Sequence, residues 1–293
     1  MKRLLLAATV IIIGAVRTFA QLSAEVSMPK FYAAALITGE KVNMRKAPSA
    51  QSQKLMKSGY GRNEEYYWGK PDEKDRYSQD IYVAHPYAYN TCRAEKTVGD
   101  WVQIDWDLYK PYVSKDFCRL YTADDFAECD EDAFQVVGYY ARKTGKYKDY
   151  YFRLDDMAFE KPNGFYYGSV IIARKMGNAL VETNSITVAM CHDTRASKPK
   201  PYRPPLSGDE SFDKAMLMVM GVSGLAYWYG DNLCKNPGED NNIDFRKFLD
   251  SMSDEQLEDY FGTASLVDIG QMVYFKLPES NAVFNIYVPS ENL

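Results

Sequence analysis

The first half of the chain alternates apolar and polar residues over short stretches, which is the pattern of half-buried strands. Val42 and Met44 are separated by one polar residue, and a Lys-Ala-Pro-Ser sequence with turn chemistry follows at 46–49. Residues 31–37 and 101–104 are further short strand candidates. The pattern therefore predicts a small structure of short strands in this half.

The second half begins with longer apolar and aromatic runs that are separated by turns. The runs cover residues 135–141, 149–154, 164–173 and 179–190. Each turn between them contains the Gly or Asn that tight turns favour, at 143–146, 161–164 and 175–178. This arrangement predicts an antiparallel meander, and 270–276 with 282–288 predict a closing hairpin.

The hydrophobic period changes after the proline-rich connection at 197–207. A capping-box sequence at 207–210 opens a predicted helix over 212–229, whose apolar residues lie all around it and predict burial. Further helix candidates are 243–252 and 257–261, the latter after a second capping box. The expected fold class is mainly β, with an α+β second domain that combines the meander with two or three helices.

Residues 1–20 have the three parts of a secretory signal peptide. Lys2 and Arg3 precede an apolar run over 4–16, and Thr18-Phe19-Ala20 provides small residues at the cleavage positions. A membrane anchor would need about 20 apolar residues, and this run is shorter. We expect a mature chain that begins near Gln21, has no membrane span, and is periplasmic or secreted.

Charge and length further limit the possible functions. Removal of the three basic residues of the signal leaves 32 basic and 40 acidic side chains, a net charge of −8, which disfavours nucleic acid as a partner. The remaining 273 residues favour two domains, and the acidic stretch at 121–132 is the predicted boundary. A calcium loop there would need spaced ligands and a glycine, which this stretch lacks.

Three motifs in the first half share an order with a known family. They are Val-Asn-Met-Arg-Lys-Ala-Pro-Ser at 42–49, Gly-Asp-Trp-Val-Gln-Ile at 99–104 and Pro-Tyr-Val-Ser at 111–114. This order resembles the bacterial SH3-like domain over residues 30–122. The resemblance implies a small β-barrel that binds cell-wall peptide or glycan, or an envelope protein. The family spaces its motifs more closely, so we expect an inserted hairpin at 59–96, followed by an α+β domain of unknown function at 133–293.

Aromatic residues are the candidate ligand-binding side chains. They are Tyr66, Tyr67 and Trp68 in the predicted insertion, and Trp101 and Tyr112 in the predicted barrel. Such rings stack on sugars or peptide side chains while their polar groups stay in water. Core packing is the alternative role. Trp101 is expected to fill the barrel, whereas three consecutive rings at 66–68 cannot all face inward on a strand.

The sequence assigns no catalytic residue, metal ligand or cofactor. Cys191 and His192 are adjacent, so on a strand they point to opposite faces and cannot form a nucleophile-base pair. The only other histidine is His85, and no Cys-x-x-Cys spacing favours zinc. A binding protein is therefore the expected function. The alternative is a cell-wall hydrolase, or another hydrolase, with its site in 133–293.

Five cysteines in a chain bound for an oxidising compartment leave at least one without a partner in the same chain. Connectivity does not follow from sequence. The two pairs that we expect first are Cys118 with Cys129 and Cys191 with Cys234.

Overall fold

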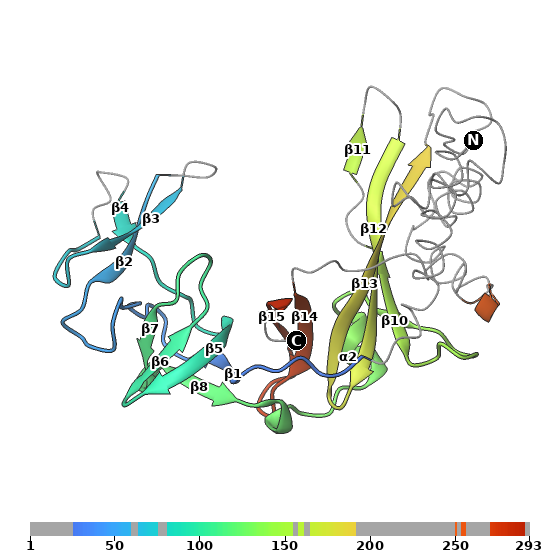
Figure 1. Cartoon of the computed structure of the whole chain (residues 1–293), viewed down its shortest axis with the longest axis horizontal. Coiled ribbons are helices and arrows are strands. Elements are labelled where there is room, and N and C mark those ends of the chain that lie inside the picture. Colours follow the sequence, from blue (N-terminus) through green and yellow to red (C-terminus); the bar gives the residue numbers. More distant parts are fainter. Residues whose placement is uncertain are drawn as a thin grey trace, which may run out of the picture. The chain divides into compact units, whose positions relative to one another are not determined.

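The computed structural model describes residues 26–59, 64–75, 81–154, 158–160, 165–191, 250, 253–255 and 270–290 (Figure 1). The protein is mainly β and is built from antiparallel sheets, as the sequence predicts. It divides into two compact units. The first unit contains residues 29–128 and 272–290, and the second contains the described residues within 129–271. The predicted signal peptide lies outside the described residues.

A five-stranded sheet forms much of the first unit, in the order β7-β6-β5-β1-β8. The strands are β1 (Ala33–Ile37), β5 (Thr91–Val98), β6 (Trp101–Ile104), β7 (Tyr112–Ser114) and β8 (Cys118–Tyr121). All five residues of β1, which lies between β5 and β8, are buried. The predicted strands at 31–37 and 101–104 are confirmed as β1 and β6.

A smaller sheet in the first unit has the order β3-β2-β4, with β2 at Lys54–Ser58, β3 at Glu65–Gly69 and β4 at Ile81–Val83. The predicted strand at 42–45 is reduced to a single bridging residue, Arg45, whose backbone exchanges two hydrogen bonds of 2.7 Å with Tyr112. The predicted insertion at 59–96 therefore supplies β3, β4 and also the first part of β5, which lies within the five-stranded sheet.

The hairpin near the C-terminus also lies in the first unit. It is formed by β14 (Gln271–Lys276) and β15 (Val283–Val288). Phe275 stacks on Phe126 with ring centroids 4.1 Å apart, and Glu279 accepts hydrogen bonds from Tyr121 (2.6 Å). The hairpin predicted from residues 270–276 and 282–288 is confirmed as β14 and β15.

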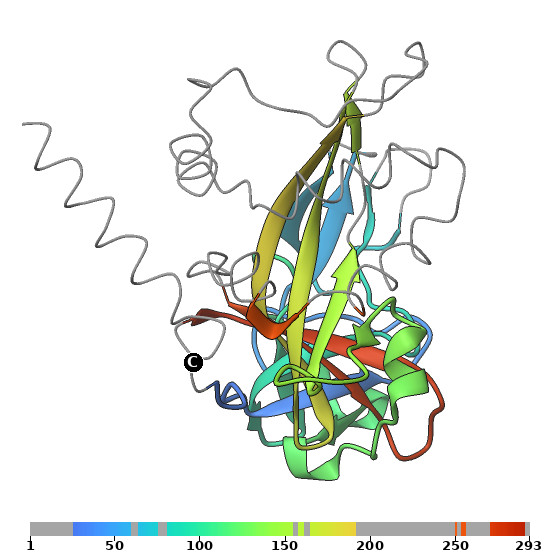
Figure 2. The same ribbon diagram turned by 90° about the vertical axis from the view of Figure 1, so that its right-hand side faces the viewer.

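The second unit contains a meander in the order β13-β12-β10-β9, and β11 pairs with β12. The strands are β9 (Tyr140–Ala141), β10 (Tyr150–Leu154), β11 (Ala158–Glu160), β12 (Phe165–Met176) and β13 (Ala179–Cys191). The two long strands β12 and β13 run side by side in both views (Figure 1 and Figure 2). The antiparallel meander is thus confirmed for β10, β12 and β13.

The predicted strand at 135–141 is wrong over most of its length. Helix α2 (Glu131–Gln135) ends at the first residue of this range, and residues 136–138 form a turn. Asp130 caps the helix by accepting a hydrogen bond of 2.8 Å from the Ala133 N–H. The helix buries Phe134, and only β9 remains of the predicted strand. Short 3-10 helices lie at Lys115–Phe117 (η3) and Ala123–Asp125 (η4).

The predicted helices at 212–229 and 257–261 lie outside the described residues, as does most of 243–252. Within the part of the chain that the structure describes, no helix is both long and apolar enough to cross a membrane.

Position 145, in a turn of the second unit, requires glycine. Its φ of 92° is unfavourable for a side chain, and a Cβ there would lie 2.4 Å from Asp254 Oδ1. Asp254 occupies this space, accepts a hydrogen bond of 2.7 Å from the Lys146 N–H, and pairs with the buried Arg142. Glycine therefore lets the turn close around a carboxylate that neutralises a buried guanidinium.

Candidate functional site

Two of the predicted ligand-binding rings, Tyr66 and Trp68, pack against the core of the first unit. They lie on one face of β3, where Trp68 is paired with the fully buried Leu55. Trp68 meets the Tyr109 ring edge-on with centroids 5.7 Å apart, and the Tyr109 hydroxyl donates to the Tyr66 carbonyl at 2.6 Å. These rings therefore hold the small sheet against the rest of the unit.

The other three predicted rings lie elsewhere. Tyr67 is paired with Met56, on the opposite face of β3 from Trp68. Trp101 lies on the outer face of β6, since Val102 is buried, and Tyr112 is on the same outer face of β7. The expectation that Trp101 fills the core is wrong, because alternation along β6 assigns the inner positions to Val102 and Ile104.

A group of exposed rings that the sequence analysis did not single out lies at the end of β1. We call Tyr87, Tyr89 and Phe117 the aromatic strip; their exposed fractions are 66%, 76% and 48%. The Tyr89 N–H donates to the Ile37 carbonyl at 2.8 Å, and the Phe117 carbonyl accepts from the Thr38 N–H at 2.9 Å. Ile37 and Thr38, at the end of β1, therefore bring together the segments that carry Tyr89 and Phe117.

The backbone that carries the two tyrosines is fixed by hydrogen bonds. Asn90 Oδ1 accepts from the Tyr87 N–H at 2.7 Å, and the Asn90 carbonyl accepts from the Ile37 N–H at 2.9 Å. Tyr89 has a φ of 68°, a left-handed conformation that bulky residues rarely adopt. Backbone strain of this kind concentrates at functional sites. Asn90 is a sequence signal for this turn, but a search for strand patterns does not find exposed rings on a turn.

A cavity of about 330 Å³ lies within the first unit, between β5, the β6–β7 turn and the C-terminal strand β15. Its lining is Thr91, Cys92, Arg93, Asp105, Trp106, Asp107, Met272, Asn285, Ile286 and Tyr287. The Thr91 hydroxyl donates to the Asn285 carbonyl at 3.0 Å and so ties β15 to β5. This volume is at the lower end of the range for small-ligand pockets.

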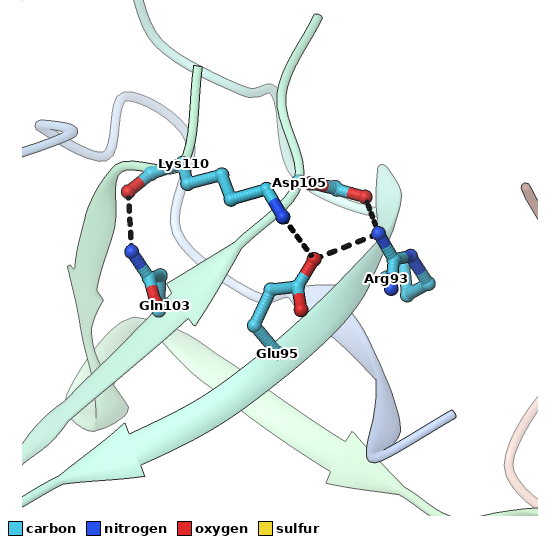
Figure 3. Close-up of polar contacts among 5 residues, drawn as sticks. All are labelled: Arg93, Glu95, Gln103, Asp105 and Lys110. Carbon is cyan, nitrogen blue, oxygen red and sulfur yellow. Dashed lines mark hydrogen bonds and ion pairs between the residues drawn. The ribbon is translucent and has the colours of Figure 1, made fainter. Parts of the chain in front are cut away.

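Two of the lining residues, Arg93 and Asp105, belong to a charged network (Figure 3). Arg93, whose side chain is almost fully buried, pairs with Asp105 and, at 2.7 Å, with Glu95. Lys110 approaches the same Glu95 oxygen at 3.2 Å, and its carbonyl accepts from Gln103 Nε2 at 2.9 Å. Burial raises the pKa of the Asp105 carboxyl, although the Arg93 guanidinium opposes this shift.

The cysteine beside this network is a poor nucleophile. Burial, with smaller effects from Asp105 and Cys118, raises the pKa of the Cys92 thiol to about 12. Cys118 is also a free thiol, and its Sγ lies 3.7 Å from the Ser114 carbonyl, so the expected Cys118–Cys129 disulfide is wrong. The other expected pair, Cys191 with Cys234, rests on side chains outside the described residues, and so does His192.

The described residues bring together no catalytic dyad at the cavity, and none of their His, Cys, Asp and Glu side chains form a group of three or more that could hold a metal. His85 is in the first unit, with Nδ1 3.0 Å from the Val83 carbonyl and its ring against Tyr87. Comparison of the chain with protein-family models, curated proteins and solved structures finds no match.

Proposed function

We propose that this protein is an exported, non-enzymatic binding protein of the bacterial cell envelope, in the periplasm or outside the cell. Its first unit acts as an SH3-like module that recognises cell-wall peptide, glycan or a protein partner. The signal-like residues 1–20 and the order of the motifs at 42–49, 99–104 and 111–114 support this proposal. So does the net negative charge of the mature chain, which disfavours nucleic acid.

The observation that carries the proposal is the aromatic strip. Tyrosine rings on a backbone that is already fixed lose little conformational entropy on binding, and they offer both apolar area and a hydroxyl. Tyr87 and Tyr89 leave most of their surface in solvent, whereas Tyr66 and Trp68 of the same unit pack against its core. A stable fold does not require this exposure, and a binding surface does.

The test is co-sedimentation of the exported chain with isolated cell-wall sacculi. The variant with Tyr87→Ser and Tyr89→Asn removes both rings, and asparagine tolerates the left-handed backbone at 89. We expect at least a tenfold loss of binding with an unchanged melting temperature. Tyr32→Ser is the matched control, because Tyr32 is an exposed tyrosine at the opposite end of β1.

Wild-type binding by the double variant would contradict the role of the aromatic strip. The same incubation tests the alternative function, since a hydrolase would release soluble fragments from the sacculi. Release of fragments by the wild-type chain would favour a hydrolase with its site in residues 133–293.

A further inference from the structure

We infer that the cavity between β5, the β6–β7 turn and β15 binds a neutral sugar ring. This inference rests on the proposed function and names the glycan among its three classes of ligand. The cavity is separate from the residues that the sequence analysis selected: none of Tyr66, Tyr67, Trp68, Trp101 and Tyr112 lines it.

The cavity presents polar groups that the protein itself does not use. Among the described residues, no hydrogen-bond or ion-pair partner is found for the Asn285 amide, the Tyr287 hydroxyl or the Asp107 carboxylate. All three side chains are exposed, so a ligand in the cavity can reach them and replace their hydrogen bonds to water.

These groups include both donors and acceptors. The Asp107 carboxylate accepts, and the Asn285 amide and the Tyr287 hydroxyl can each donate or accept. A sugar hydroxyl also donates and accepts at the same oxygen, so neighbouring hydroxyls can meet such groups at once. Trp106 and Tyr287 add aromatic surface, on which the C–H face of a sugar ring packs.

The charge of the site disfavours an anion. Arg93 is already paired with Glu95 and Asp105, and Lys110 is paired with Glu95. Asp107 adds a third carboxylate, so the cavity and its network have two cations and three carboxylates. A carboxylate or phosphate ligand would be repelled by this excess, whereas a neutral ring would not.

Asp107 lies in a turn whose backbone is fixed by hydrogen bonds. Trp106 and Tyr109 exchange two backbone hydrogen bonds, of 3.0 and 2.8 Å, so Asp107 and Leu108 form a two-residue turn. Asp107 has a φ of 52°, in the left-handed region, and Leu108 at the tip is 92% exposed. The backbone of the turn therefore places Asp107 at the cavity before any ligand arrives.

The experiment is calorimetric titration of the full exported chain with the trimer of N-acetylglucosamine. Asn285→Ala should weaken binding about five- to tenfold, the effect of one lost hydrogen bond to a ligand. Asn281→Ala, at an exposed asparagine in the turn of the same hairpin, should leave the affinity unchanged. Asp107→Asn tolerates the left-handed backbone and keeps an acceptor, so it should lower the affinity by no more than about threefold.

Equal affinities of Asn285→Ala and the wild type would overturn the assignment of the cavity. If the chain sediments with sacculi but does not bind the trimer, the inference that the cavity binds a sugar is wrong and the proposed function is unaffected. Failure of both assays would overturn the proposed function as well. If a lysine-containing stem tripeptide binds the wild type but not Asp107→Asn, the cavity binds an ammonium group instead of a sugar.

Discussion

Replacement of Trp68 by alanine should destabilise the first unit rather than remove a ligand contact. A buried tryptophan lost to alanine costs about 3 to 5 kcal/mol. Trp68 is only partly buried, so we expect the lower end, about 3 kcal/mol, which includes about 1 kcal/mol from the edge-on contact with Tyr109. For a unit of this size that loss corresponds to a fall in melting temperature of roughly 10 °C.

Urea denaturation followed by tryptophan fluorescence would measure the change, since Trp101 and Trp106 remain in the first unit. Trp68→Phe keeps an aromatic edge against Tyr109 and should lose about half as much stability. Leu108→Ala is the control, because a side chain that is 92% exposed should alter the free energy of unfolding by less than about 0.5 kcal/mol. A loss below about 1 kcal/mol in Trp68→Ala, together with weaker binding to sacculi, would refute the packing role.

Two further predictions concern titratable groups. Burial raises the pKa of Cys92 to about 12 and of Cys118 to about 11, so iodoacetamide at pH 8 should label neither in the native chain and both in urea. The protonated thiols stabilise the fold below about pH 8.5, and this contribution should be lost as the pH rises toward these values; rapid native labelling would contradict the assignment. Hydrogen bonds from the Lys146 N–H and Arg142 lower the pKa of the Asp254 carboxyl, so its stabilising effect is present above about pH 4 and is lost as the pH falls. Melting curves of Asp254→Asn should show a lower transition at pH 7 and a smaller loss on acidification than wild type, and parallel pH profiles would exclude this role.

Local signals in the sequence were enough for the strands of the second unit and insufficient for its first helix. The turn between β12 and β13 was predicted from Lys-Met-Gly-Asn, and Gly177 there has the φ of 57° that favours glycine. The acidic stretch at 121–132 indicated a solvated linker or the start of a helix, and the structure shows a helix start there, capped by Asp130. With so many carboxylates in this stretch, the sequence does not identify Asp130 as the one that accepts from the Ala133 N–H.

The candidate sites were harder to predict because they depend on pairings far apart in sequence. Alternation along β15 predicts that Asn285 and Tyr287 share one face and Ile286 the other, and this is observed. It does not predict that the hairpin lies against β5, where Thr91 donates to Asn285 across 194 positions. The cavity therefore forms only when the segments near Thr91 and near Asn285 have come together, and closing so long a loop has a large entropic cost. Contacts that offset this cost, such as the stacked Phe126 and Phe275 rings, therefore stabilise the arrangement that forms the cavity, although neither ring lines it.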